Sequence, residues 1–361
     1  MEWTRRTLMI ALAMRDKGSS QQRWELYQRL CQNEWTEGKF TLEAIHQELS
    51  LEELEWLRNT DFARLELQYR KENIHFLMYE DVLYPKRLKE IYLPPVVLFY
   101  KGRLELFNRL SIGIVGARNH TEYSKEALEY LLPDILERKV SIISGLARGI
   151  DTIAHLNSLS NKGRTIAVLA SGFNHIYPKE NKILVEKILQ NNGLIISEYP
   201  PDQEIDMSKF RHRNRIISGM SLGVLVVEAR LNSGSMITAN LAIKQSKPVF
   251  CIPGNLTDPL SLGCNKLISN GANLVISPLD VMNYIGIEEQ EEEINSKYKD
   301  IYYAIGNIPS TVDEIIERSG KTVAEVNTTL VMLELEDKVI NLPGGRYVIK
   351  YKMKEDVKNV L

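Results

Sequence analysis

The amino-acid sequence predicts an α/β protein with a doubly wound, mostly parallel sheet at its centre. Short runs rich in Ile and Val alternate with stretches of helical periodicity between residues 111 and 276. This alternation is typical of parallel strands joined by helices. The runs lack polar alternation, as expected of strands that helices cover on both faces. Helical periodicity also fills the first 75 residues, and three helical stretches followed by two short strands end the chain.

Length and composition indicate an ordinary globular protein of several domains. The chain has 361 residues, which predicts two to three domains at about 150 residues each. Its hydrophobic fraction of 44% and charged fraction of 25% are usual for a soluble protein. The formal net charge of −2 excludes a strongly basic, DNA-coating protein. Any polyanion must therefore bind where cations cluster locally.

The sequence predicts a cytoplasmic protein. Cys31, Cys251 and Cys264 are far apart and form no CxxC pair, so they suit a reducing compartment and predict no metal site. No apolar run approaches the ~20 residues of a membrane span. The N-terminus resembles an amphipathic helix more than a signal peptide, because charged residues follow its apolar stretch at once. We expect no association with membranes.

Residues 1–75 are expected to form a small helical domain. Apolar residues recur there at helical spacing. Ser50 followed by Glu53 has the pattern of a capping box, and the segment that begins at Thr41 resembles one. The next segment contains three prolines and the apolar run 96–100. It predicts an extended connection or an edge strand, because proline cannot donate to a central ladder.

The predicted sheet and its helices occupy residues 76–286. Strands are expected at 112–115, 140–143, 166–169, 194–196, 222–227, 249–252 and 274–276. Helices are expected at 122–138, 149–160, 179–191, 235–245 and 262–270. In open α/β sheets, ligands bind in the loops at the carboxyl ends of the strands. We therefore expect the functional site at those loops.

The end of the chain resembles a winged helix. An acidic run at 288–293 predicts a linker over residues 287–296. Residues 297–361 then contain three helices and a hairpin around a Pro-Gly-Gly turn, which is winged-helix order. The third helix, 322–336, carries three glutamates and no Lys or Arg. This composition argues against a regulator of duplex DNA and favours a contact with protein.

The first two strands of the predicted parallel sheet each lead into a glycine-containing turn with an arginine. Gly116, Ala117 and Arg118 follow the first strand, and Gly145 and Arg148 follow the second. Small residues let a ligand approach the backbone, and the fork of an arginine can clamp a phosphate. The first turn lacks the GxGxxG pattern, and no acidic residue ends the next strand. A dinucleotide cofactor is therefore not expected.

The carboxylates near these turns have structural interpretations that we prefer to catalytic ones. Asp151 is placed to cap the helix that begins at Thr152 and to pair with His155 one turn later. Glu228 ends a later strand and is the carboxylate to consider as a catalyst. A salt bridge from Glu228 to a neighbouring arginine is the preferred interpretation. We therefore predict no catalytic residue.

The turn after the third strand combines an aromatic ring, a cation and an amide. These residues are Phe173, Lys179 and Asn181. Such a mixture suits bases stacked on rings with phosphates held beside them. The structural alternative is that Pro178 begins the next helix and that Tyr177 is simply packed. The two interpretations are compatible.

The densest group of cations lies in the segment 209–215. Arg211, Arg213 and Arg215 alternate there. An extended chain would project all three to one side, whereas a helix would place the first and third on one face. Either arrangement predicts a concentrated cationic patch. A buried strand follows, and then the turn Ser233–Gly234–Ser235, whose hydroxyl and N–H groups at a helix start suit phosphate.

In chain order, these motifs resemble the DNA-processing protein A family (DprA, also called Smf). The matching segments lie within about residues 80–280 and are GIVGAR, SGLARGIDTIAH, SGFNHIYPKEN, ISEYPP, FRHRNRIISG, VVEARLNSGSMITA, PGN and GCNKLISNGA. The resemblance implies an extended Rossmann-like fold that binds single-stranded DNA without sequence preference. It also implies a homodimer that loads the RecA recombinase onto DNA during natural transformation and recombination.

The resemblance further implies which residues hold phosphate. They are Gly116, Arg118, Gly145, Lys179, Arg211, Asn214 and the turn Ser233–Ser235. Ala117 stands where many relatives carry a hydroxyl residue, so we expect its backbone alone to take part. The dimer and recombinase surfaces of the family lack motifs, and no residues are assigned to them. No cofactor and no metal are expected.

The alternative is an enzyme that acts on nucleotides, such as a nucleoside-monophosphate glycohydrolase with a related sheet. Such enzymes carry a PGGxGTxxE turn with a catalytic glutamate. In this chain the PGG at Pro343 is followed by Arg-Tyr instead. We therefore prefer a DNA-binding protein without enzymatic activity.

Overall fold

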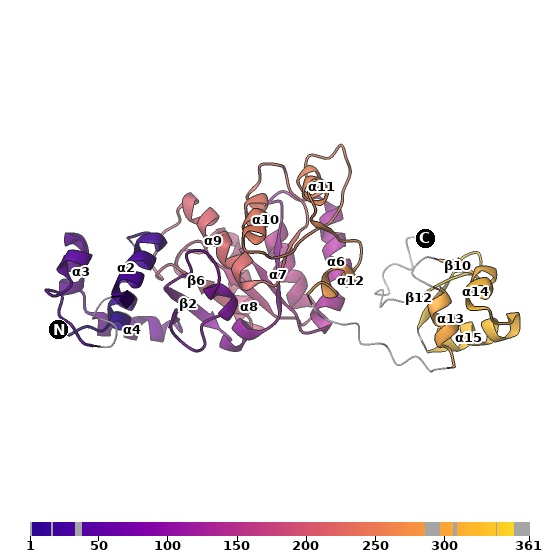
Figure 1. Cartoon of the computed structure of the whole chain (residues 1–361), viewed down its shortest axis with the longest axis horizontal. Coiled ribbons are helices and arrows are strands. Elements are labelled where there is room, and N and C mark those ends of the chain that lie inside the picture. Colours follow the sequence, from indigo (N-terminus) through magenta and orange to yellow (C-terminus); the bar gives the residue numbers. More distant parts are fainter. Residues whose placement is uncertain are drawn as a thin grey trace. The chain divides into compact units, whose positions relative to one another are not determined.

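The computed structural model describes residues 2–15, 17–32, 38–285, 297–305, 309–336 and 338–349. The chain divides into two compact units, Met1–Ile287 and Glu288–Leu361. Figure 1 traces both in the colours of the sequence. The predicted acidic linker, residues 287–296, falls outside the described residues.

The first unit is built on a nine-stranded sheet in the order β1-β2-β6-β5-β4-β3-β7-β8-β9. The strands from β6 to β9 in this order are parallel, whereas β1 and β2 pair in antiparallel fashion. The predicted mostly parallel α/β fold is therefore confirmed. The strands are His75–Met78 (β1), Val97–Gly102 (β2), Ser111–Val115 (β3), Ser141–Ser144 (β4), Thr165–Val168 (β5), Leu194–Ser197 (β6), Val224–Val226 (β7), Val249–Cys251 (β8) and Asn273–Leu274 (β9).

Helices alternate with the strands, and five of them lie close to the predicted ranges 122–138, 149–160, 179–191, 235–245 and 262–270, whereas the helices at 86–89, 207–220 and 278–282 were not predicted. From the sheet onward the helices are Lys86–Lys89 (α5), Glu122–Glu137 (α6), Ile150–Ser160 (α7), Lys182–Gln190 (α8), Met207–Met220 (α9), Gly234–Lys244 (α10), Leu262–Ser269 (α11) and Pro278–Met282 (α12). Short 3-10 helices lie at Leu104–Asn108 (η3) and Lys179–Asn181 (η4). Residues 209–215 belong to α9 and are therefore helical and not extended.

Alternate residues of the strands face opposite layers of helices, which explains their continuous apolar runs. Ile142 of β4 belongs to a core that α6 and α7 complete. The next residue, Ile143, belongs to a second core, to which α9 and α10 contribute. Both side chains are fully buried. The sheet thus holds the carboxyl ends of β3, β4, β5 and β7 at one rim, where the predicted ligand turns begin.

The position of β2 differs from the prediction of a connection or an edge strand. It lies inside the sheet and pairs with β1 on one side and β6 on the other. The prolines precede the strand and leave its own N–H groups free to pair, and Val97, Leu98 and Phe99 are buried. The edge position is taken by β1, which was not predicted, because its four residues are too few to show a period.

The N-terminal helices pack on the sheet. They are Arg5–Ala13 (α1), Ser20–Gln32 (α2), His46–Glu48 (η2, a 3-10 helix), Leu51–Asn59 (α3) and Phe62–Lys71 (α4). Ser50 and Glu53 form the predicted capping box of α3. The segment after Thr41 is a turn, and no α-helix begins there. Leu26 and Tyr69 share one core with Phe99 of β2, so these helices belong to the same compact unit as the sheet. Their separation as a domain at residue 75 remains a prediction.

The second unit has the predicted winged-helix order. Its elements are Lys299–Ile305 (α13), Ser310–Thr311 (β10), Val312–Ser319 (α14), Val323–Leu335 (α15), Val339–Leu342 (β11) and Arg346–Ile349 (β12), with the sheet order β10-β12-β11. Capping boxes begin both α14 and α15, through Thr311 with Glu314 and Thr322 with Glu325. A small core of its own fills this unit.

Candidate nucleic-acid interface

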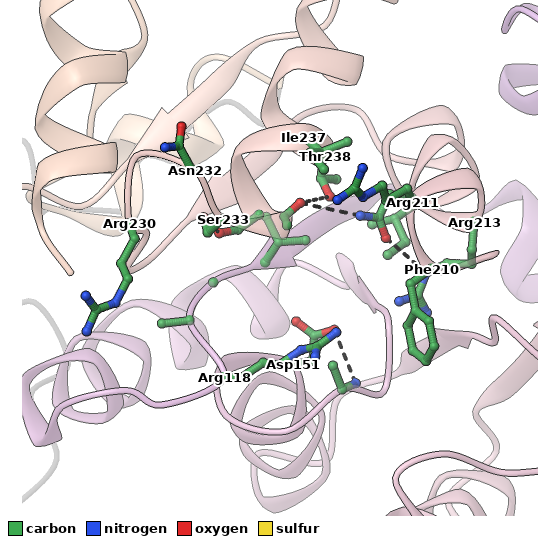
Figure 2. A pocket seen from close by; sticks show the side chains of 18 of the residues that line it. Arg118, Asp151, Phe210, Arg211, Arg213, Arg230, Asn232, Ser233, Ile237 and Thr238 are labelled. Atoms are coloured by element: carbon green, nitrogen blue, oxygen red, sulfur yellow. Dashed lines mark hydrogen bonds between the residues drawn. The ribbon is translucent and has the colours of Figure 1, made fainter. Parts of the chain in front are cut away.

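A cavity of about 760 Å³ opens where the strand order reverses. From β3 the chain continues to β4 on one side of the sheet, and from β7 it continues to β8 on the other side. The strands β3 and β7 are neighbours. The loops after β3 and β7 diverge at this point, and such switch points are where doubly wound sheets bind ligands. Figure 2 shows the side chains that line the cavity. The described lining comes mainly from the β3 turn, α9, and the loop between β7 and α10.

Of the four arginines that line this cavity, Arg213 is buried, and the other three are exposed and come from three different elements. Arg118 follows β3, Arg211 lies on α9, and Arg230 lies in the loop after β7 (Figure 2). All three side chains are exposed, and within the described residues none of the three forms an ion pair. Because their charges are not neutralised by the protein, they form a concentrated positive site for an anionic ligand.

The start of α10 adds backbone donors to the same cavity. Ser233 is the N-cap residue in an extended conformation, and its side chain makes no capping hydrogen bond. Its hydroxyl instead lies 2.7 Å from the hydroxyl of Ser235. A side chain at Gly234 would project into open space, so nothing covers the first turn there. The N–H groups of a first helical turn have no intrahelical acceptor and favour an anion.

Phe210 supplies an aromatic face among these cations. Its ring lies 5.7 Å from the guanidinium carbon of Arg118 and meets the ring of Tyr177 edge to face at 5.6 Å. Phe210 is half-buried, so part of its surface is available to a ligand. Rings beside cations are what a stacked base and its phosphate require. Together these groups make the cavity suited to a nucleotide unit of a polyanion.

Phe210, Arg230 and Asn232 line the cavity although sequence reasoning did not select them. Phe210 lies four residues before Asn214, and both belong to the cavity-lining side of α9. That i, i+4 spacing would have marked the pair if residues 207–220 had been interpreted as a helix. Arg230 and Asn232 lie next to the predicted Ser233–Ser235 turn and carried no periodic signal of their own.

The prediction that Arg213 belongs to an exposed patch is wrong. Its side chain is 3% exposed and donates hydrogen bonds to the carbonyls of Gly145, at 2.6 Å, and of Val168. Burial lowers the pKa of the Arg213 guanidinium to about 10, although Asp151 opposes the shift. Arg213 therefore ties α9 to the ends of β4 and β5, and it lines the cavity as a buried residue.

Arg215 is also buried, which corrects the predicted pairing of Arg211 and Arg215 on one exposed face. Its Nη2 donates to both carboxylate oxygens of Glu198, and His212 lies 3.5 Å from the same carboxylate. Burial acts to raise the pKa of Glu198, but the charge of Arg215 prevails, His212 acts in the same direction as Arg215, and the pKa falls to about 2. Of the three alternating arginines, Arg211 alone is exposed.

The turn after β5 lies outside the described cavity lining. Lys179 is exposed on η4, and Arg148 forms a 2.6 Å ion pair with Glu180 beside it. Phe173 is buried, 8% exposed. Asn181 is buried and donates to the carbonyl of Leu146 at 2.9 Å. Lys179 and Arg148 are thus accessible to a ligand, whereas Phe173 and Asn181 serve the packing of this loop.

The glycines of the first two turns allow close packing under the cavity. A Cβ at Gly116 would lie 2.5 Å from the side chain of Ile150, and one at Gly145 would lie 2.4 Å from the guanidinium of Arg213. Ala117, between β3 and Arg118, is 8% exposed and still lines the cavity. These small residues bring α7 and α9 close to the strand ends, so that the backbone itself forms part of the cavity wall.

The carboxylates and the histidine considered in the sequence have other partners than predicted. Asp151 accepts hydrogen bonds from the N–H groups of Gly145 and Ala147 instead of capping its own helix, and burial raises its pKa. His155 lies 2.6 Å from the hydroxyl of Thr165, and burial lowers its pKa to about 3. Glu228 accepts from the N–H and hydroxyl of Thr121, and no arginine of the described ranges forms an ion pair with it.

Neither a membrane segment nor a cluster of metal ligands is found in the described part of the chain. No helix there is long and apolar enough to cross a membrane. No group of three His, Cys, Asp or Glu side chains in the same residues is placed to hold a metal ion.

Known proteins resemble both units of the chain. The family model of DNA recombination-mediator protein A matches residues 75–286, and the DprA winged helix domain matches residues 288–345. Protein Smf of Escherichia coli is 35% identical over 287 residues, which are 76% of this chain and 77% of that protein. The DNA processing protein DprA of Bacillus subtilis is 44% identical over 214 residues, 59% of this chain and 72% of that protein.

Two solved structures support the same relationship. The X-ray structure of DNA processing protein A from Streptococcus pneumoniae has a TM-score of 0.69 at 35% identity, and the match covers 78% of this chain and 98% of that one. DNA processing protein A from Helicobacter pylori, whose structure concerns its single-stranded DNA binding mode, has a TM-score of 0.53 at 34% identity, with coverages of 58% and 94%. The chain therefore belongs to the DNA recombination-mediator protein A family.

Proposed function

We propose that the chain binds single-stranded DNA without sequence preference and that the cavity between β3 and β7 holds its backbone. The observation that carries this proposal is the meeting of three unpaired arginines, Arg118, Arg211 and Arg230, with the uncapped start of α10. The single-stranded DNA binding of the relative from Helicobacter pylori supports the choice of ligand.

The chemistry of the cavity favours an unpaired strand over a duplex. Arginines and helix N–H groups contact phosphates, which carry no sequence information. Phe210, half-buried beside Arg118, offers a stacking face that any base satisfies. A base must leave its duplex to reach such a face. The proposed binding is therefore sequence-independent and specific for single strands.

The test is a salt series of oligonucleotide binding with Arg118→Ala and Arg211→Ala. Each substitution removes one phosphate contact, so affinity should fall for all sequences alike and the salt slope should decrease by about 0.7 per contact on single strands. Arg103→Ala is the matched control, because Arg103 is exposed and does not line the cavity. Unchanged affinity in both cavity variants, or an equal loss in the control, would contradict the placement of the strand.

Within this proposal, the bound strand is delivered to RecA during natural transformation and recombination. Membership of a recombination-mediator family supports this role. The compartment we propose is the cytoplasm, which suits three free cysteines. RecA-catalysed strand exchange should be faster with the chain present, and Arg118→Ala should lose most of that gain. Strand exchange that is indifferent to the chain would reject RecA loading while leaving DNA binding intact.

We further propose that the chain forms a homodimer. Support comes from exposed apolar side chains on the elements at the β9 end of the sheet: Ile243 of α10 is 54% exposed, Leu274 of β9 is 46%, and the following Ile276 is 68%. Exposed apolar groups of this kind mark interaction surfaces. Leu274→Glu should convert a dimer into a monomer in sedimentation, whereas Leu256→Glu, at another exposed leucine, should not. A wild-type monomer at micromolar concentration would exclude the homodimer.

A nucleotide-processing enzyme remains the second candidate, because the cavity lies where a mononucleotide also binds in such sheets. The carboxylate in the described lining is Asp151, which is already engaged by the Gly145 and Ala147 N–H groups. We therefore propose that the chain binds DNA and does not catalyse a reaction on nucleotides. Release of base from nucleoside monophosphates that Glu228→Gln or Asp151→Asn abolishes would reverse this choice.

A further inference from the structure

The outward side of α15 in the second unit carries an apolar stripe that no other described residue of the chain covers. Val326, Leu330 and Leu333 of this helix are buried in the core of the unit. On the opposite side, at the spacing i, i+4, i+7 and i+11, are exposed residues that we call the α15 face: Ala324, Thr328, Val331 and Leu335. This spacing places them in one line along the helix.

The exposure of the α15 face is unusual for its composition. Val331 is 53% exposed and Leu335 is 77% exposed, and Met332 beside them is 37% exposed. A helix that is apolar on nearly all sides is normally covered on all sides. Here the core covers only one side within the described residues. The free side is therefore suited to a further protein element.

Carboxylates flank the α15 face on both sides. Glu334 lies along one side of the stripe, and Glu325 and Glu336 lie along the other, all three exposed. Residues 322–336 contain no Lys or Arg. The side chain of Glu325 caps its own helix through Thr322 but keeps its charge. The apolar stripe thus has a negative border along its length.

The negative charge of this border determines which class of macromolecule can bind the α15 face. In winged helices that read DNA, the third helix enters the major groove and needs cations toward phosphate; three carboxylates there would repel the duplex. A second copy of α15 would bring the same carboxylates against each other, which costs several kcal/mol of complementarity in like-charge interfaces. A protein partner whose apolar surface has a positive border would not be repelled by these carboxylates.

We propose that the α15 face is a docking surface for an amphipathic protein helix whose apolar stripe is bordered by lysines or arginines. The partner helix packs its apolar side chains on Val331 and Leu335, in the manner of helix recognition through i, i+4, i+7 anchors. Its cations pair with Glu325, Glu334 and Glu336, which sets the orientation of the helix and excludes acidic partners. This inference does not depend on the DNA site of the first unit.

The experiment uses the full chain and a synthetic helical peptide of about 18 residues, long enough to hold its helix. The peptide carries leucines on one face and lysines on its borders, and a second peptide carries glutamates in place of the lysines. Binding is measured by fluorescence anisotropy at several salt concentrations. The wild-type chain should bind the lysine peptide and not the glutamate peptide.

Two variants separate the apolar stripe from its border. Val331→Asn with Leu335→Gln should weaken binding of the lysine peptide about tenfold or more. Glu334→Lys with Glu336→Lys should reverse the preference between the two peptides, so that the glutamate peptide binds more tightly than the lysine peptide. All four residues are exposed, so thermal unfolding should be unchanged. Leu256→Gln is the control, since Leu256 is 79% exposed in the first unit.

Four results would overturn the proposal. They are absence of lysine-peptide binding to the wild type, equal binding by the wild type and both variants, loss of duplex DNA binding in the stripe variant, and a change of its mass in solution. The third result would make the face a DNA reader, and the fourth would make it a contact between copies. Failure of single-stranded DNA binding, by contrast, would affect only the function proposed for the first unit.

Discussion

One nitrogen of Arg215, Nη2, donates hydrogen bonds of 2.6 and 2.8 Å to the two carboxylate oxygens of Glu198. Both side chains are almost completely buried, so this ion pair joins α9 to the end of β6 inside the protein. On its other side, α9 presents Phe210 and Arg211 to the cavity. One short basic segment therefore supplies both the support of the candidate site and its contacts.

Removing one member of the buried pair should destabilise the fold strongly. Arg215→Ala leaves the Glu198 carboxylate buried without its partner, and such changes cost about 3–5 kcal/mol in the free energy of unfolding. Urea denaturation would measure the loss. The control is Arg70→Ala, because Arg70 pairs with Glu66 on the surface and should change little. Equal effects of the two substitutions would contradict a buried, coupled pair.

The same pair should make stability depend on acidity. The pKa of Glu198 is lowered from 4.5 to about 2 in the folded chain, so the unfolded state binds the proton more readily. Its contribution is complete above about pH 4.5 and is lost as the pH falls toward 2. The difference in unfolding free energy between the wild type and Glu198→Gln should therefore shrink over this range. A difference that is constant from pH 6 to pH 2.5 would refute the shift.

Lys247 should act in the opposite pH range. Its Nζ donates to the carbonyls of Ser218, at 2.8 Å, of Ser221, at 2.7 Å, and of Gly219, at the end of α9. Burial lowers the pKa of Lys247 to about 8, with a smaller effect of Arg87 in the same direction. The folded chain thus releases the proton first, and stability relative to Lys247→Met should rise between about pH 8 and pH 10.5. Thermal unfolding of the wild type and Lys247→Met at pH 7.5, 9 and 10 measures this change in relative stability. A relative stability of the wild type that falls as the pH rises would contradict the lowered pKa of Lys247.

Phe210 and Arg118 should affect DNA binding in different ways. Phe210→Ala removes a stacking face, worth about 1–3 kcal/mol per base, without changing the charge of the cavity. Affinity should fall for every sequence while the salt slope stays the same. Arg118→Ala should lower the slope by about 0.7.

Because the two side chains are in contact, the double variant should lose less than the sum of the single losses. Phe173→Ala is the contrasting substitution. Phe173 is buried, so its loss should lower stability before it affects the affinity of the folded chain. If Phe173→Ala lost much of its affinity for single-stranded DNA at every salt concentration while its melting temperature stayed unchanged, Phe173 would be a DNA-binding residue after all.

Much of the fold was predictable because its signals are local. The strands of the parallel sheet are short, mostly apolar runs, and the turns after β3 and β4 contain glycines, so pattern and spacing suffice to place them. Gly116, Arg118 and the Ser233–Ser235 turn were selected for this reason, and the structure brings these three to one cavity. The place of β2 was not predictable, because its pairing partner β6 lies about a hundred residues later in the chain and no local pattern reports such a partner.

The chain's sequence by itself determined the succession of the parallel strands from β3 to β9, five of the helices that connect them, and the presence of a basic segment before β7, since these follow from periodicity and composition. Only the tertiary structure decided which of Arg211, Arg213 and Arg215 faces the solvent. The three residues are chemically identical, but their environments differ because α9 packs with its apolar side toward the core. This orientation buries the guanidiniums of Arg213 and Arg215, which donate to a carbonyl and to a carboxylate respectively. The same packing left Phe210 accessible and enclosed Phe173, a choice that depends on neighbours distant in sequence.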